Sequence, residues 1–374
     1  MQKKFLSMIT AIVMLLSLLP QGIITVSAMS GSGTATDPYI ITTAAELSTI
    51  GGEENKNTYF KLGNDIDVDR NFSTIDAFYG VLDGNGKWIS GVNITEEIES
   101  ARQITSKGRL FNTIEENAVV YNLTLSAPKL KVDYHAVQGT ASAYYLKRGL
   151  FVNTNYGTLN NIYLRDVKVD ASVQDFSVSP NSYLQVGELG VMAHINRGKI
   201  LNSKITGTVT ARNICFFGAV AFQNMATGIV ANVVSDVNLD IIPIDSDEKG
   251  LFQSNSLGVT YNRGGYIYNL WALGTISGGT WQWDVTNTSR YLCTGNSGTI
   301  ENGYYKTSTG KFALNGAVND SSYLGTGTSS GIEEKSALDN GIYTSNQTAK
   351  ANEIVGTGSG ALYTREWKNN DGTV

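Results

Sequence analysis

Three aspartates in one short segment could bind a metal ion. Asp65, Asp67 and Asp69 alternate with Ile66 and Val68, so on a β-strand the carboxylates would share one face and the apolar side chains the other. Oxygen ligands of this kind suit Ca²⁺, and calcium is the one cofactor that the sequence suggests. We favour a solvated strand face over a calcium site, because most carboxylates lie at protein surfaces without a metal.

The two histidines are the only side chains with an ordinary pKa near neutrality. His135 lies in a segment expected to be a loop, and His194 in a segment expected to be a turn. Neither belongs to a His-Glu-x-x-His zinc motif, and no Gly-x-Ser-x-Gly nucleophile motif occurs in the chain. We therefore interpret both histidines as structural or surface residues.

Paired aromatic residues are the main candidates for a binding surface. They are Trp281, Trp283, Tyr304, Tyr305, Tyr144 and Tyr145. The two tryptophans are separated by one residue, so both indoles would lie on one face of a strand. Exposed flat rings can bind sugars or protein partners. The alternative is that these rings pack beneath long loops.

These candidate residues lie on a chain with an internal sequence repeat, which determines where they are placed. A Gly or small residue, a hydrophobic residue two positions on and an Asn four positions on recur six times. The Asn residues, spaced by 39, 41, 30, 37 and 33 residues, are Asn122, Asn161, Asn202, Asn232, Asn269 and Asn302. Apolar residues alternate after several of them, which is the period of a strand with one buried face.

This repeat predicts an all-β, right-handed parallel β-helix. No long helical pattern separates the short strands, which excludes βαβ folds and helical solenoids, and hairpin turns are too scarce for propeller blades. Like positions of successive coils then stack at about 4.8 Å. Asn tolerates the left-handed backbone of a sharp corner, and stacked amides can bond to one another. The six Asn are expected to form a structural ladder.

The two cysteines lie in non-adjacent repeats, which makes a disulfide geometrically unfavourable. Cys215 is in an apolar run, and Cys293 follows another apolar residue. We expect both to be free thiols.

The first strand of a solenoid has an exposed edge that needs a cover. Thr43 and Glu46 have the spacing of a capping box, which predicts a short helix from Ala44 to about Ile50 with Leu47 and Ile50 facing inward. We assign the β-helix to residues 29–330 and an irregular closing segment to residues 331–374.

Residues 1–28 have the features of a secretory signal peptide. Lys3 and Lys4 precede an apolar run, and small residues end at Ala28. The run is shorter than the roughly 20 residues that span a bilayer, and no later stretch is long and apolar enough. We expect a secreted or cell-surface protein with no membrane span after signal removal.

The amino-acid composition argues against a disordered protein and against a nucleic-acid-binding protein. With 41% hydrophobic and only 16% charged residues, the chain is not of the disordered type. A net charge of −5 gives no electrostatic reason to expect a nucleic-acid partner.

Several segments carry a family resemblance: GSGTATDPYIITTAAELSTI, KLGNDIDV, YGVLDGNGKWISGVNI and the Asn-ended repeats. Together they resemble bacterial surface proteins with GLUG-type repeats, and are similar to amino-terminal regions of immunoglobulin A peptidases and filamentous-haemagglutinin-like adhesins. The resemblance covers residues 31 to about 310 and implies a right-handed β-helix displayed outside a bacterial cell. No window reads strictly Gly-Leu-hydrophobic-Gly.

Two functions remain open. The first is a non-catalytic, monomeric, adhesin-like module that binds host or matrix glycans or proteins. The second is a polysaccharide lyase or glycoside hydrolase on a similar β-helix. Glycoside hydrolysis needs two carboxyl groups about 5–9 Å apart, so an enzyme should bring carboxylates and a Lys or Arg together in one groove. We expect a binder rather than an enzyme.

Overall fold

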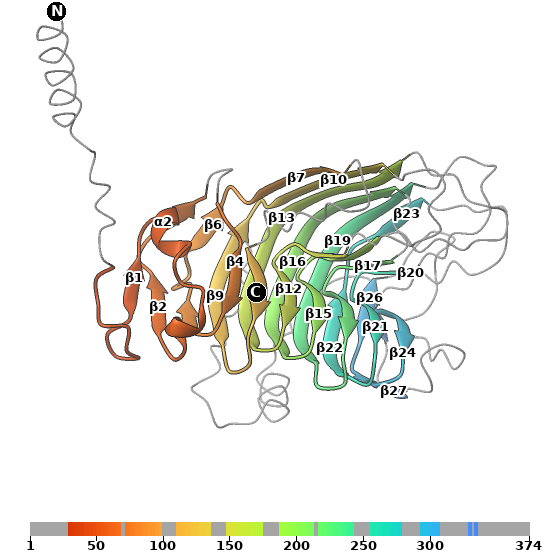
Figure 1. The fold of residues 1–374 in the computed structure, drawn as a ribbon. Coiled ribbons are helices and arrows are strands. Elements are labelled where there is room, and N and C mark those ends of the chain that lie inside the picture. Colours follow the sequence, from red (N-terminus) through yellow and green to blue (C-terminus); the bar gives the residue numbers. More distant parts are fainter. Residues whose placement is uncertain are drawn as a thin grey trace, which may run out of the picture.

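The computed structural model describes residues 29–68, 72–98, 110–135, 147–174, 187–212, 216–242, 254–278, 292–306, 328–330 and 333–335. They form a solenoid of stacked strands (Figure 1). The strands pair with one another in parallel, and an isolated antiparallel bridge joins Ser30 to Ile40. The parallel β-helix predicted from the sequence is confirmed.

The coils contribute to three sheets, which we call the short, middle and long sheets. The short sheet contains β11 (Lys147–Gly149), β14 (Glu188–Gly190), β17 (Phe216–Gly218) and β20 (Ser254–Ser256). The middle sheet contains β4 (Ile75–Phe78), β8 (Phe111–Ile114), β12 (Val152–Asn155), β15 (Ala193–Asn196), β18 (Ala221–Asn224), β21 (Val259–Asn262) and β24 (Cys293–Asn296).

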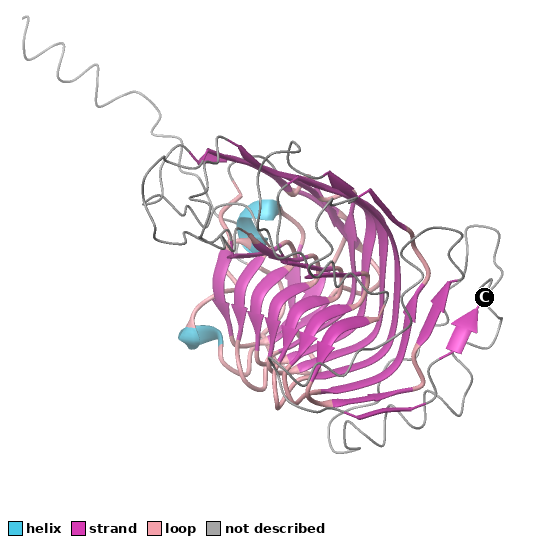
Figure 2. Cartoon of the chain, turned by 90° about the vertical axis from the view of Figure 1, so that its right-hand side faces the viewer, coloured by secondary structure: helices cyan, strands magenta, loops and turns pink. Residues whose placement is uncertain are grey.

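The long sheet holds the remaining strands, and from β4 onward it follows the middle sheet along the chain. Its strands are β1 (Tyr39–Ile41), β2 (Tyr59–Leu62), β3 (Ile66–Asp67), β5 (Val81–Asp83), β6 (Trp88–Ser90), β7 (Asn93–Ile98), β9 (Val119–Ser126), β10 (Lys129–His135), β13 (Thr158–Gln174), β16 (Lys199–Arg212), β19 (Ile229–Ile242), β22 (Tyr266–Ala272), β23 (Ile276–Gly278), β25 (Thr299–Glu301), β26 (Tyr304–Lys306), β27 (Thr328–Ser330) and β28 (Glu333–Lys335). Figure 2, a view along the stack, shows these strands lying on one another and curving around the interior.

Alternation of side chains explains why the long strands form. In β19, Val237, Leu239 and Ile241 are buried, while Asp236 and Asp240 on the opposite face are exposed. Each strand therefore presents one apolar face to the interior. The same alternation in β16 keeps the two strands in register along their length.

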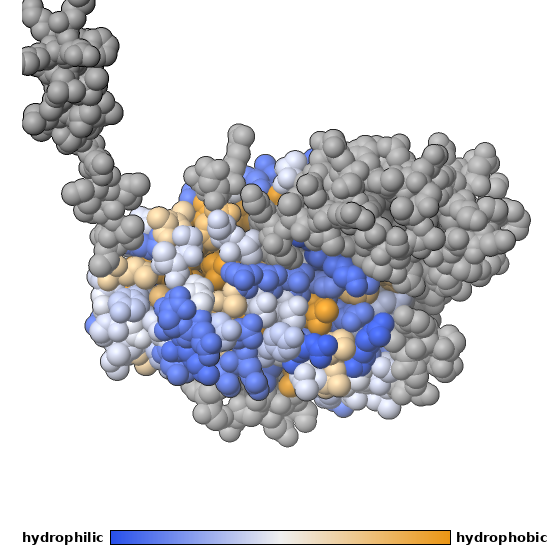
Figure 3. Space-filling view, viewed as in Figure 1, coloured by the Kyte–Doolittle hydropathy of each residue, from blue (hydrophilic) through white to orange (hydrophobic). Residues whose placement is uncertain are grey.

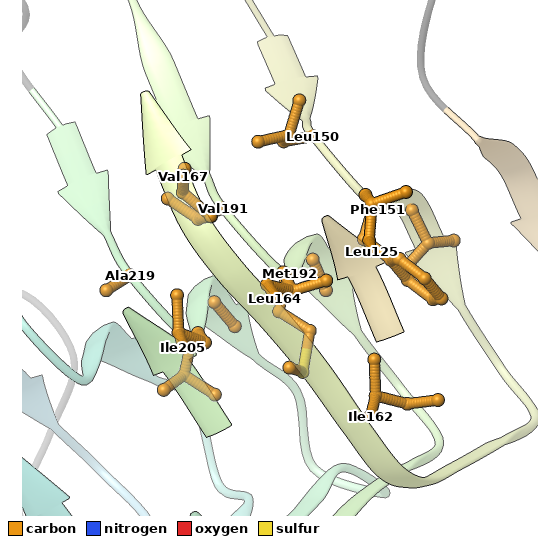
Figure 4. Close-up of a cluster of buried hydrophobic side chains, with 14 of the residues drawn as sticks. Leu125, Leu150, Phe151, Ile162, Leu164, Val167, Val191, Met192, Ile205 and Ala219 are labelled. Atoms are coloured by element: carbon orange, nitrogen blue, oxygen red, sulfur yellow. The ribbon is translucent and has the colours of Figure 1, made fainter. Parts of the chain in front are cut away.

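The interior is a continuous apolar core. Leu125, Leu164 and Ile205 are register neighbours on three successive long strands, and all three are fully buried (Figure 4). Burying one such side chain stabilises the fold by about 1.5–3 kcal/mol relative to leaving it in water. Stacking like residues through the coils thus supplies the main stabilising term.

The predicted amino-terminal helix is also confirmed, although it is shorter than expected. Helix α2 (Ala44–Leu47) has a complete capping box, in which the Glu46 N–H donates to Thr43 Oγ1 and the Thr43 N–H donates to Glu46 Oε2, at 3.1 and 3.0 Å. Leu47 and Ile50 are fully buried. The short 3₁₀ helix η1 (Glu53–Asn55) follows it.

The helical segment covers the edge of the middle sheet. Between α2 and η1, the Gly52 N–H donates to the Ala77 carbonyl of β4 at 2.8 Å. The segment therefore lies where a further strand would otherwise pair, and it satisfies a carbonyl of the β4 edge.

We expect Cys293 to resist alkylation in the folded protein. This cysteine is a free thiol, fully buried at the start of β24, and Cys215 lies outside the described residues. Burial raises the pKa of the Cys293 thiol to about 12, so almost no thiolate, the reactive form, exists at pH 8. In a Cys215→Ser background, iodoacetamide should label Cys293 only after denaturation. Rapid labelling of the native protein at pH 8 would contradict this burial.

Candidate functional site

The predicted Asn residues occupy the corners of the long sheet. All six have φ between 47° and 56°, in the left-handed region. Asn161 donates to Asn122, Asn232 to Asn202, and Asn269 to Asn232, at 2.7, 3.0 and 2.8 Å between Nδ2 and Oδ1. The Asn202 Nδ2 donates instead to Asn160 Oδ1 at 2.9 Å. These amides hold neighbouring corners together.

A second Asn ladder, not recognised in the sequence, closes the middle strands. Its members are Asn155, Asn196, Asn224, Asn262 and Asn296, all fully buried. Each Nδ2 donates to the Oδ1 of the next member at 2.8–2.9 Å. The sequence did hold a signal, because these Asn precede the corner Asn by 6, 6, 8, 7 and 6 residues. Buried and mutually bonded, they are part of the scaffold.

The predicted aromatic surface is described only in part. Trp281, Trp283, Tyr144 and Tyr145 lie outside the described residues. The two neighbouring tyrosines of β26 do not share a face. Tyr304 stacks on the buried Trp271 at 4.1 Å between ring centroids, whereas Tyr305 packs against the apolar core.

The carboxylates of the predicted calcium segment contact protein donors. Asp65 Oδ1 accepts from the Trp88 N–H at 3.0 Å, and Asp67 Oδ1 accepts from Ser90 Oγ at 2.8 Å. Asp69 lies outside the described residues. In the part of the chain that the structure describes, no three His, Cys, Asp or Glu side chains gather as a metal site. The calcium site stays a prediction.

The histidine predictions were wrong in their secondary structure. His194 lies in β15 rather than a turn, and His135 is the last residue of β10 rather than a loop residue. The short strand around His194 is stabilised by parallel pairing with β12 and β18 on both sides, which a local sequence pattern does not reveal.

The buried His194 belongs to an ionisable cluster that reaches the surface at Lys147. Its Nε2 lies 3.0 Å from Glu188 Oε2, and Lys147 Nζ lies 3.6 Å from the same oxygen. The His194 ring stacks on Phe222 at 5.3 Å. Among the residues that the structure describes, Glu188 is the one carboxylate in this cluster, whereas glycoside hydrolysis uses two. The cluster therefore lacks the arrangement that we set as the mark of a hydrolase.

A row of exposed and half-buried side chains crosses the outer face of the long sheet. Trp88, Thr124, Tyr163 and Lys204 are successive register neighbours on β6, β9, β13 and β16, so about 4.8 Å separates adjacent members. Trp88 is 43% exposed. We call these four residues, with Arg165 of β13, the aromatic–cation row.

Cations lie over both rings of the row. The Arg165 guanidinium carbon is 5.8 Å from the Trp88 ring centroid, and Lys204 Nζ is 5.6 Å from that of Tyr163. Arg165 Nη2 also donates to Ser126 Oγ at 2.7 Å, which fixes its position. Burial lowers the pKa of Lys204, and the nearby Asp236 carboxylate opposes that shift. Sequence reasoning missed this row because its members come from four coils.

The rest of the described surface offers no large apolar patch. Trp88 and Tyr156 are the exposed large hydrophobic residues among the described ones. On the face shown in Figure 3, hydrophobic residues lie in small areas between hydrophilic ones. Among the described residues, no helix has the length and apolar character needed to cross a membrane.

Comparisons with known proteins found distant relatives. No family model matches the chain. A "Putative Gly-rich membrane protein" of Evansella cellulosilytica is 29% identical over 143 residues, covering 35% of this chain, and Halomucin of Haloquadratum walsbyi is 28% identical over 123 residues, covering 28%. The matches span 15% and 1% of those two relatives.

One solved structure is similar, that of a "putative immunoglobulin A1 protease" from Bacteroides ovatus. It has a TM-score of 0.41 and 14% identity, over 70% of this chain and 85% of that one. At this level of likeness, no statement about the activity of this chain follows.

Proposed function

We propose that the chain is a cell-surface β-helix module that binds extracellular glycans or proteins without catalysing a reaction. The amino-terminal signal features and the names of the two relatives, a membrane protein and a halomucin, support a place at the cell surface. The aromatic–cation row is the observation that carries the binding role.

The row suits recognition for physical reasons. The flat ring of Trp88 offers apolar area on which a sugar face or an apolar side chain can stack. Arg165, held beside it, offers planar donors for hydroxyl or carboxylate oxygens. Both side chains lie on paired strands, so little conformational freedom is lost on binding. A surface row whose members include no pair of carboxylates favours binding over bond cleavage.

Trp88→Ala should weaken ligand binding at least tenfold, because the loss of a central aromatic contact costs about 2 kcal/mol. The ligand would first be identified by applying the mature chain to glycan and host-matrix arrays, and the affinity then measured by calorimetry. Tyr156→Ala is the matched control, since Tyr156 is 44% exposed but lies outside the row.

Two results would contradict the proposal. Equal affinities of the Trp88→Ala and Tyr156→Ala variants would show that the row does not bind the ligand. Release of reducing sugar or unsaturated uronate from a polysaccharide would instead support the lyase or hydrolase alternative.

A further inference from the structure

Three lysines lie on two neighbouring strands beyond the aromatic–cation row. Lys129 and Lys131 of β10 and Lys168 of β13 are all exposed on the outer face of the long sheet. Lys129 and Lys168 are direct register neighbours, and Lys131 lies two residues further along the same face. We call these residues the lysine patch.

The charges of the patch are not compensated by ion pairs within the described part of the chain. None of the three lysines has a carboxylate within 4.0 Å there. Asp170 is the register neighbour of Lys131 and offsets one charge at longer range. Two like charges directly opposite each other destabilise a sheet, so the Lys129–Lys168 pair has a cost that an anionic ligand would remove.

The patch and the row make one cationic surface on an acidic protein. Lys168 lies three residues after Arg165 on β13, and Lys204 is on the neighbouring strand β16. These five cations lie on three neighbouring strands, β10, β13 and β16, although the whole chain has a net charge of −5. The acids beside them are Asp166, 4.0 Å from Arg165, and Asp170 on β13, with Asp236 near Lys204 and Asp240 on β19. The positive charge of this surface is therefore concentrated at the three lysines of the patch.

We propose that this surface binds a linear acidic polysaccharide, an inference that rests on the proposed binding function and names its ligand class. Charge complementarity favours a polymer with repeated negative groups, because the lysines are spaced along and across strands rather than gathered around one point. Exposed Trp88 and half-buried Tyr163 offer rings for stacking on sugar units. Thr208 of β16, the register neighbour of Lys168, adds a hydroxyl for hydrogen bonds.

Other anionic partners fit less well. A membrane surface would favour apolar side chains that insert beside the cations, but within the described residues Trp88 and Tyr156 are the exposed large hydrophobics. Nucleic acid recognition by charge alone would favour a basic domain, which this chain is not.

The test compares polygalacturonate, dextran sulfate, neutral dextran and a DNA duplex as ligands for the mature full-length chain. The combined Lys129→Ala, Lys131→Ala and Lys168→Ala variant should bind one or both acidic polysaccharides about tenfold more weakly or worse, as expected from the loss of three surface charge contacts. Binding to the acidic polymers should also weaken with salt, and less steeply in the variant. Comparing carboxylate with sulfate polymers shows which anion is preferred.

Two further variants serve as controls. Lys56→Ala, Lys61→Ala and Lys199→Ala together change the net charge equally but lie outside the patch, and they should leave the affinity within twofold. Replacing the three patch lysines by arginine keeps the charge and should retain binding, which separates charge loss from misfolding.

Several outcomes would overturn the inference. Equal weakening in the control triple variant would mean that only total charge matters. DNA binding with the same dependence on the patch would show that the surface is not specific for polysaccharides. Binding of a neutral glycan or protein that depends on Trp88, without binding of acidic polymers, would refute the ligand class while leaving the proposed function standing; no binding at all would refute both.

Discussion

Asn224→Leu is expected to destabilise the solenoid by about 3–5 kcal/mol, because it leaves two buried polar partners unpaired. Asn224 is fully buried in the ladder of the middle sheet. It accepts from Asn196 Nδ2 at 2.8 Å and donates to Asn262 Oδ1 at 2.9 Å. Leucine has a similar volume but no polar atoms, so the side chain still fits while the amide contacts are lost.

Urea unfolding followed by circular dichroism would measure this effect. Asn112→Leu is the control, since Asn112 also bonds to a neighbouring coil, through Asp76 Oδ1 at 2.8 Å, but at an exposed site. We expect the control to cost less than about 1 kcal/mol, because water can replace its hydrogen bond. Similar midpoints for both variants would show that the buried ladder contributes little to stability.

Gly190→Ala should have a still larger effect and prevent accumulation of soluble folded protein. A Cβ at Gly190 would overlap the backbone carbonyl oxygen of Ala193 and lie 3.0 Å from the Cα of His194. These atoms belong to the main chain and cannot rotate away, so the connection from the short sheet to the middle sheet would have to open. A forced shift of that kind exceeds the usual 1–3 kcal/mol cost of overpacking.

The matched control is another glycine with open space around it. Gly264 has φ of +78°, and a Cβ there would meet Ala226 atoms at no less than 3.4 Å. Gly264→Ala should therefore cost only about 1–2 kcal/mol, from the left-handed backbone. Soluble yield and thermal midpoint would be compared, and equal behaviour of the two variants would refute the steric argument.

The sequence revealed those features of the fold that depend on local residue chemistry. The corner Asn were recognisable because each follows a small residue and a core residue at fixed spacing, and because Asn tolerates a positive φ. The amino-terminal helix was recognisable from Thr43 and Glu46 alone. Neither feature depends on how long the connections between strands are.

Contacts between coils were harder to predict, because they depend on coil length. Tyr163 and Lys204 are 41 residues apart in the chain, and loops of unequal length decide that they become register neighbours. The contact between His194 and Glu188 depends on the tight connection that begins at Gly190. Residue type alone does not show that Tyr163 lies beside Lys204 or that His194 lies beside Glu188.

The side-chain amides of the two Asn ladders point in opposite directions along the solenoid. At the long-sheet corners Asn232 donates toward the amino-terminal end, to Asn202, whereas in the middle sheet Asn196 donates toward the carboxyl-terminal end, to Asn224. Each aligned ladder polarises its own members and builds up a dipole moment with every added coil. Because the two moments oppose each other, they offset one another along the axis, and the net axial dipole of a longer rod grows less than either ladder alone would make it.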